Sequence, residues 1–282
     1  MKFAICNETF QEHGEQWPIE RIISYCAEIG YDGIEIAPYT LADSAYDVKP
    51  ERRTEIRAAA EKAGLQIVGL HWLLAAPAGL YVNHPDDAIR DKTEAYLKEL
   101  VAMCADLGGE VLVFGSPKQR SILDGWSARR TWRRTIEIFR RLAEVAARKN
   151  VYLLIEPLPT KETNFIMSLD DGLDMIREVA NRHFRLHLDV KAMAADMSRA
   201  VADTLRAEGG KYLYHLHAND PNLRGPGFGD QDFVPIFQAL NEIGYDRWVS
   251  VEVFDYSPDP KTIGIKSLKY LKMCRDEASK PS

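Results

Sequence analysis

At 282 residues, the chain is long enough for one large α/β barrel or two small domains with a sizeable core. Its hydrophobic content of 46% and charged content of 28% are those of an ordinary soluble globular protein. A net charge of −6 argues against a surface for nucleic acid or for an anionic membrane.

The sequence carries no evident signal for export or for membrane insertion. No apolar stretch approaches the roughly 20 residues that span a bilayer. Residues 1–8 contain too few apolar residues for a signal peptide and predict a first strand instead. The four cysteines, at positions 6, 26, 104 and 274, show no C-x-x-C spacing. We therefore expect free thiols and a cytoplasmic protein.

Strands and helices alternate along the whole chain. The first four predicted strands cover 3–8, 33–37, 66–73 and 111–115, and the helices after them cover about 18–29, 50–63, 86–107 and 127–149. Pro18 suits a first helical turn, and Gly30 suits the position just after a helix. Four more units follow, with helices over about 168–180, 196–208, 232–243 and 260–274.

The strands of these last four units are short apolar runs, rich in β-branched and aromatic residues, as in buried parallel strands. They read VYLLIEP, FRLHLDV, LYHLHAND and WVSVEVF. Each run ends in a residue that can bind a metal: Glu156, Asp189, His217 and Glu252. One polar strand end means little, but four on successive strands form a constellation.

Eight strand-then-helix units predict an α/β fold, a single (β/α)8 TIM barrel spanning residues 1–282 as one domain. A doubly wound sheet is the alternative, but G-x-G-x-x-G after the first strand and G-x-x-x-x-G-K-[ST] are both absent. In a TIM barrel the active site lies at the C-terminal ends of the strands. The four strand-end residues are therefore predicted to meet there.

Three carboxylates and one imidazole suit one divalent ion, Mn²⁺, Mg²⁺, Co²⁺ or Zn²⁺, with positions left open for substrate oxygens. Acids converging without a cation would repel each other. The alternative is that an Arg, a Lys or a helix N-terminus neutralises each acid separately. His217 is preferred to His215 as the ligand because it lies nearer the strand end, and His215 would orient a ligand by a hydrogen bond.

Six further polar residues are candidates for substrate binding: His71, Glu35, Lys118, Lys191, Arg224 and His215. His71 and Glu35 lie near the ends of predicted strands, although Glu35 could instead pair with a basic residue. Lys118 and Lys191 lie at the barrel mouth, where an exposed, solvated lysine is the alternative. Arg224 lies in the glycine-rich loop 221–230, where it could contact an anionic group.

The motifs IEP, HLDV, HLHAND and VSVEVF, with Glu, Asp, His and Glu spaced by 33, 28 and 35 residues, resemble the xylose isomerase-like barrel superfamily. Within it, the chain looks most like the sugar-phosphate isomerase/epimerase branch, which includes ketose 3-epimerases, hydroxypyruvate isomerase and inosose dehydratase. GYDRWVSVEVF is similar to the entry to the eighth strand in those proteins.

This resemblance implies that Glu156, Asp189, His217 and Glu252 hold one metal, manganese among the candidates. Glu156 and Glu252 would act as the acid/base pair that moves a proton beside the carbonyl of a small carbohydrate, a ketose or keto-sugar with or without a phosphate. The ketose 3-epimerases carry a substrate-binding His three residues after the metal-binding Asp, where this chain has Ala192. That departure weakens a 3-epimerase assignment.

Two other functions remain open at this point. A metal-dependent lyase or dehydratase could act on a keto-sugar, keto-inositol or 3-ketoglycoside through the same chemistry. Apurinic endonucleases share the superfamily, but they need more metal ligands and a basic groove, which a net charge of −6 does not support. We expect a carbohydrate substrate, no nucleic acid or membrane partner, and, by resemblance, a homodimer or homotetramer.

Overall fold

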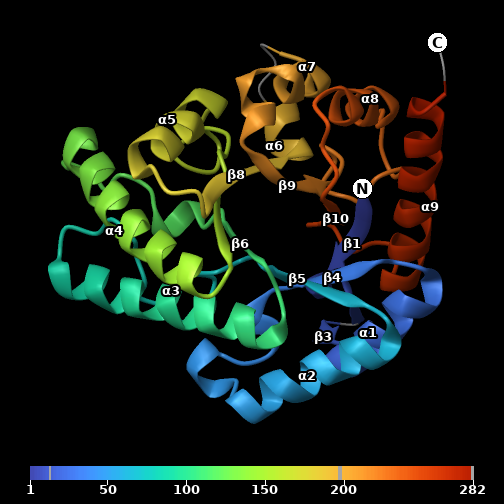
Figure 1. Cartoon of the computed structure of the whole chain (residues 1–282), viewed down its shortest axis with the longest axis horizontal. Helices are drawn as coiled ribbons and strands as arrows, with labels where there is room; N and C mark the ends of the chain where they lie inside the picture. The colour runs from blue at the N-terminus through green and yellow to red at the C-terminus, as the bar shows by residue number, and fades with distance from the viewer. Residues whose placement is uncertain (13, 196–198, 281–282) are drawn as a thin grey trace. The chain divides into compact units, whose positions relative to one another are not determined.

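The computed structural model describes residues 1–12, 14–195 and 199–280. Eight parallel strands form a closed barrel in the order β1-β10-β9-β8-β7-β6-β5-β4, so the predicted (β/α)8 TIM barrel is confirmed (Figure 1). No helix in this part of the chain is long and apolar enough to cross a membrane. Cys6, Cys26, Cys104 and Cys274 are free and buried, as expected.

The barrel strands are β1 Lys2–Cys6, β4 Gly33–Ile36, β5 Gln66–Leu70, β6 Val111–Phe114, β7 Tyr152–Ile155, β8 Phe184–Asp189, β9 Leu213–Ala218 and β10 Trp248–Val251. The helices are α1 Ile19–Ile29, α2 Pro50–Ala63, α3 Asp87–Leu107, α4 Ala128–Arg148, α5 Leu169–Val179, α6 Val190–Ala194, α7 Val201–Arg206, α8 Val234–Glu242 and α9 Pro260–Ala278. A two-stranded antiparallel sheet, β2 Gln11–Glu12 and β3 Glu15–Gln16, follows β1.

Local signals explain where several helices begin and end. Asp86, Ser127 and Asp259 each accept a backbone N–H at the start of α3, α4 and α9. Ser168 forms a capping box with Asp171 at the start of α5. The predicted boundaries of these helices therefore agree closely with the structure.

Three predicted elements differ clearly from the structure. The first strand was expected over 3–8, but β1 ends at Cys6 and the 3-10 helix η1 Asn7–Thr9 follows it. The third strand was expected to run to residue 73, but β5 ends at Leu70. The helix expected over 196–208 begins on residues 196–198, which lie outside the described residues. Around them the chain forms two short helices, α6 directly after β8 and then α7, followed by the 3-10 helix η5 Glu208–Lys211.

By its contacts the chain divides into two compact units. The first comprises Met1–Glu35, Ala58–Val68 and His187–Ser282. In it, β1 pairs with both β10 and β4, and β10 pairs with β9, all parallel. A Cβ added at Gly33 would lie 2.8 Å from the ring of Trp248, so this strand position has room only for glycine.

The second unit comprises Ile36–Arg57 and Gly69–Leu186. Strands β5, β6, β7 and the first residues of β8 lie side by side in it. A Cβ at Gly69 would lie 2.0 Å from the main-chain oxygen of Val111, which explains a glycine inside β5. The ring centroid of Phe139, in α4, lies 5.0 Å from that of Phe114 and 5.2 Å from that of Phe184. These three rings form the core between α4 and the strands.

Candidate metal centre

Asp189 ends β8 and is held from two sides. Its Oδ1 accepts the main-chain N–H of Ala192 at 2.7 Å, because Asp189 is the N-cap of α6. Its Oδ2 accepts the side-chain amide of Asn219 at 2.5 Å, and Oδ1 of Asn219 accepts the N–H of Lys191 at 2.8 Å. Asp189 and Asn219 are buried, so these bonds fix the orientation of the carboxylate.

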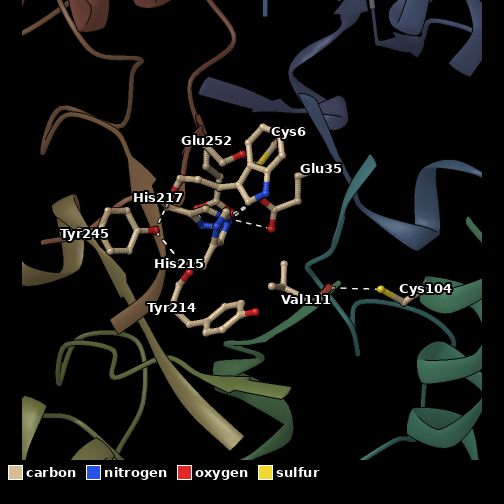
Figure 2. A network of polar contacts seen from close by, with 11 residues as sticks. Cys6, Glu35, Cys104, Val111, Tyr214, His215, His217, Tyr245 and Glu252 are labelled. Atoms are coloured by element: carbon tan, nitrogen blue, oxygen red, sulfur yellow. Dashed lines mark hydrogen bonds and ion pairs between the residues drawn. The ribbon is translucent and has the colours of Figure 1, made fainter. Parts of the chain in front are cut away.

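His215 and His217 lie on the same face of β9, because side chains alternate along a strand. Figure 2 shows both rings converging on Glu35 from β4. Nε2 of His215 lies 2.8 Å from Oε2 of Glu35, and Nε2 of His217 lies 3.1 and 3.2 Å from its two oxygens. All three side chains are fully buried. Both histidines therefore donate from Nε2 to this carboxylate.

That arrangement turns the other nitrogen of His217 toward Glu252, which directly follows β10. Nδ1 of His217 lies 3.2 Å from Oε2 of Glu252. Burial lowers the pKa of His217, but the charges of Glu35 and Glu252 outweigh burial and hold the pKa well above its ordinary value. A proton on Nδ1 of His217 therefore faces the carboxylate of Glu252.

The charges around Asp189 also favour a bound cation. Burial, and then the charge of Glu252, raise the pKa of Asp189 to about 6, against the lowering effects of Lys191 and His217. Two buried carboxylates and one imidazole nitrogen therefore lie close together, and a divalent ion would relieve their repulsion. Among the described residues, His187, His215 and His217 form a further group with ligand nitrogens within 4.8 Å of one another.

Cys6, at the end of β1, lies beside this cluster, with Sγ 3.7 Å from Oγ of Ser250. Burial, then the charge of Glu35, raise the pKa of its thiol well above the ordinary value. The thiol would have to lose its proton before the sulfur could bind a metal. The donor set at the ends of β8, β9 and β10 is one of oxygen and nitrogen.

Glu156 directly follows β7 in the second unit and is buried. The residue before it, Ile155, pairs with Leu186 of β8. A Cβ added at Gly115 would lie 2.2 Å from Oε2 of Glu156, so the carboxylate packs against a bare glycine backbone. The main-chain oxygen of Glu156 accepts an N–H of Arg120 at 2.7 Å.

The remaining predicted substrate contacts have varied surroundings. His71 lies just past β5, is buried, and donates its main-chain N–H to Ile36 at 3.1 Å. Lys118 is exposed in the 3-10 helix η4 Pro117–Gln119. Nζ of Lys191, half-buried, lies 4.1 Å from the ring centroid of Phe254. Glu35 accepts hydrogen bonds from two histidines. A pairing with a basic residue was the alternative considered from the sequence.

Arg224 has partners within its own unit. Its Nε donates to Oδ2 of Asp255 at 3.0 Å, and one Nη donates to Oγ of Ser257 at 2.9 Å. The loop that carries Arg224 is organised by Asp220, whose two oxygens accept the N–H groups of Asn222 and Gln231, each at 3.0 Å. The guanidinium is thus positioned by an ion pair that the sequence did not suggest.

Two residues with clear roles at the strand ends were missed from the sequence. Asn219, in the HLHAND motif, lies two residues after His217, so strand alternation alone would have placed it on the same face. Arg120 gave no such signal, since a basic residue in a loop after a strand reads as exposed. The structure instead buries it completely.

The chain is similar to proteins named as sugar epimerases. The chain is 27% identical over 237 residues to D-psicose 3-epimerase of Ruminiclostridium cellulolyticum, covering 82% of this chain and 77% of that protein. It is 26% identical over 267 residues to 3-dehydro-D-guloside 4-epimerase of Escherichia coli K12, covering 89% and 92%. The predicted carbohydrate isomerase or epimerase agrees with the activities named for these relatives.

Solved structures share the fold across the whole chain. A structure of L-ribulose 3-epimerase superposes with a TM-score of 0.85 at 21% identity, covering 98% of this chain and 95% of that one. D-psicose 3-epimerase from Clostridium cellulolyticum H10 superposes with a TM-score of 0.79 at 24% identity, covering 99% and 96%. The family model for the xylose isomerase-like TIM barrel matches residues 23–274. The chain therefore belongs to the xylose isomerase-like TIM-barrel family.

Proposed function

We propose that the protein is a divalent-metal-dependent epimerase or isomerase of a small carbohydrate, a ketose or keto-sugar. One observation carries the proposal most directly: Nε2 of His217 is committed to Glu35, so Nδ1 faces Glu252 at 3.2 Å. A histidine fixed in this way by a buried carboxylate is the usual arrangement of a metal ligand. Relatives named as sugar epimerases give the substrate class.

Glu156, Asp189, His217 and Glu252 would hold the ion. Three carboxylates and one imidazole accept Mn²⁺, Mg²⁺, Co²⁺ or Zn²⁺, with manganese among the candidates. A bound ion would polarise the substrate carbonyl and stabilise negative charge on the neighbouring oxygens. The N–H of Ala192 holds one oxygen of Asp189 and the amide of Asn219 holds the other, so the orientation of the carboxylate does not depend on the ion.

Glu156 and Glu252 supply the proton transfers. One carboxylate removes the proton from the carbon next to the carbonyl, and the other returns a proton to the opposite face, which inverts that carbon. Return of the proton to the neighbouring carbon would give isomerisation instead. Both side chains are buried, which protects the reactive intermediate from water.

The residue at position 192 bears on which sugars the protein can bind. Ala192 is buried, and its N–H donates to Asp189. Because its side chain is only a methyl group, it cannot form a hydrogen bond with a sugar hydroxyl. The relatives act on free ketoses and on a 3-dehydro-glycoside, and the substrate panel should contain both kinds. Loss of mass from a substrate, with a new enone absorbance, would identify the lyase alternative. A homodimer or homotetramer remains a prediction that light scattering can test.

The test uses protein purified without a metal-affinity tag. Metal content is measured by mass spectrometry before and after EDTA, and turnover is followed in D₂O by ¹H NMR with D-psicose, L-ribulose and 3-keto-glucosides. We expect about one divalent ion per chain, loss of turnover after EDTA, recovery with Mn²⁺, and deuterium at the carbon beside the carbonyl. Glu156→Gln and Glu252→Gln should lose at least a hundredfold in kcat, whereas the exposed Glu28→Gln should not. Full turnover by the metal-free protein would contradict the proposal.

A further inference from the structure

Arg120 is a charged side chain that the proposed chemistry does not use and that the fold nevertheless buries completely. It lies directly after η4, in the connection that follows β6. Burial lowers the pKa of its guanidinium to about 10, against the charges of Glu156, Glu162 and Asp171, so it stays protonated at neutral pH. Burying a charge costs free energy unless hydrogen bonds compensate for it, so the partners of the guanidinium should show why it is buried.

The guanidinium donates to three main-chain oxygens. One Nη lies 2.7 Å from the oxygen of Glu156 and 3.5 Å from that of Phe114, the last residue of β6. The other Nη lies 3.1 Å from the oxygen of Ile166. The planar fork of one arginine thus joins the ends of β6 and β7 to the far end of the loop 157–166.

The backbone at Ile166 is strained. Its φ is 59°, a left-handed conformation that is an outlier for a β-branched residue. The oxygen of Ile166 accepts both the Arg120 guanidinium and, at 3.2 Å, the N–H of Leu158. Such strain persists only where the surroundings impose it, and it is concentrated at functional sites. Arg120 supplies part of that constraint.

The segment that carries Arg120 is itself fixed. Nδ2 of Asn83 donates to the oxygen of Arg120 at 2.5 Å. Two residues further on, the N–H of Ile122 donates to Oδ1 of Asn164 at 2.6 Å, and Nδ2 of Asn164 donates back to the oxygen of Ile122 at 3.0 Å. The connections after β5, β6 and β7 are therefore bonded to one another around the arginine.

We infer that Arg120 is a positioning residue for Glu156: it fixes the main chain of Glu156 and seats the loop 157–166, so that the carboxylate points to the metal and the substrate. The inference rests on the proposed function, in which Glu156 is both ligand and acid/base group. The carboxylate of Glu156 also packs against Gly115. In this role Arg120 would act through the main chain of Glu156 and Ile166, whose oxygens it binds.

The test compares wild type, Arg120→Met, Arg120→Lys and a matched control, Arg53→Met. Arg53 is also buried in the second unit and donates to two main-chain oxygens, of Val48 and Ala45, far along the chain from Glu156. Each EDTA-treated protein is titrated with Mn²⁺ alone by calorimetry, its melting temperature is measured, and hydrogen exchange is followed in residues 157–166.

We expect Arg120→Met to weaken Mn²⁺ binding at least tenfold, to lower kcat, and to speed exchange in the loop. Arg120→Lys keeps the charge but has a single nitrogen, so its Mn²⁺ affinity should lie between those of wild type and Arg120→Met. If the Met variant does not fold, the Lys variant still tests the inference. Arg53→Met should lose stability but keep its affinity within about twofold. Wild-type affinity in both Arg120 variants, or an equal loss in Arg53→Met, would overturn the inference. Absence of Mn²⁺ binding by wild type would instead overturn the proposed function.

Discussion

Nδ2 of Asn219 donates to Oδ2 of Asp189 at 2.5 Å, and the same side chain accepts the N–H of Lys191 through Oδ1. One buried amide thereby links the end of β9 to the end of β8 and to the first turn of α6. Carboxylates that bind metals are commonly oriented by such hydrogen bonds, and their loss weakens metal binding.

Replacing Asn219 with Ala should therefore weaken Mn²⁺ binding by about 10–100-fold, because Oδ2 of Asp189 loses the amide donor of Asn219 and the carboxylate can rotate. Calorimetric titration of the EDTA-treated variant measures this. Asn241→Ala, at an exposed position of α8, is the control and should bind as wild type does. Equal affinity in the two variants would show that Asn219 does not orient Asp189.

Glu35→Gln tests the buried carboxylate between two histidines. Glutamine has one oxygen and one N–H₂ group, so at least one of His215 and His217 would face a donor instead of an acceptor. We expect a loss of about 1–3 kcal/mol in the free energy of unfolding, the cost of an unsatisfied buried donor, measured by urea denaturation. Metal affinity should fall as well, because Nδ1 of His217 is no longer reserved for the ion. An unchanged unfolding midpoint would contradict this account.

Gly115→Ala tests the fit of Glu156 against the backbone. The added Cβ would lie 2.2 Å from Oε2, so the carboxylate has to move. We expect Mn²⁺ affinity to fall by roughly tenfold or more, with kcat falling in parallel. Gly64→Ala is the comparison, because φ there is +71° and no atom lies within 4 Å of the new Cβ. That variant should lose about 1–2 kcal/mol of stability but keep its affinity for the ion.

The eight strand-and-helix units could be predicted because buried parallel strands are continuous apolar runs, and the caps of α3, α4, α5 and α9 are written in the sequence. The same logic placed Asp189 and His217 at strand ends. It could not show that Glu35 accepts hydrogen bonds from both His215 and His217, since this depends on residues 180 and 182 positions away.

Arg120 was beyond sequence reasoning for a related reason. Its acceptors are main-chain oxygens, which every residue possesses, and two of them lie 36 and 46 residues further along the chain. The residue types at those positions therefore do not predict the contact. The short helix α6 was missed because its N-cap is Asp189, a residue already explained as a strand end and a ligand.

The pairing of Arg224 with Asp255 gives a prediction for pH. Hydrogen bonds from the Ser257 side chain, then its main chain, and then Arg224 lower the pKa of Asp255 to about 2. Because the folded-state pKa lies below the ordinary value of 3.8, the contribution of these contacts to stability is complete above that value and is lost as the pH falls through about 2. Asp255 should therefore stay ionised, and keep its ion pair with Arg224, throughout the neutral pH range.

Carboxyl ¹³C NMR of Asp255 measures this directly. We expect a midpoint near 2 in wild type, a rise toward 3.8 in Ser257→Ala, and a smaller rise in Arg224→Gln, because the serine makes the larger contribution. Asp246, whose pKa is lowered by the N-terminal amino group of Met1, provides a carboxyl reference that neither change should move. A midpoint near 3.8 in wild type would mean that Arg224 is not held by Asp255, and the guanidinium would then be available to swing toward an anionic substrate group.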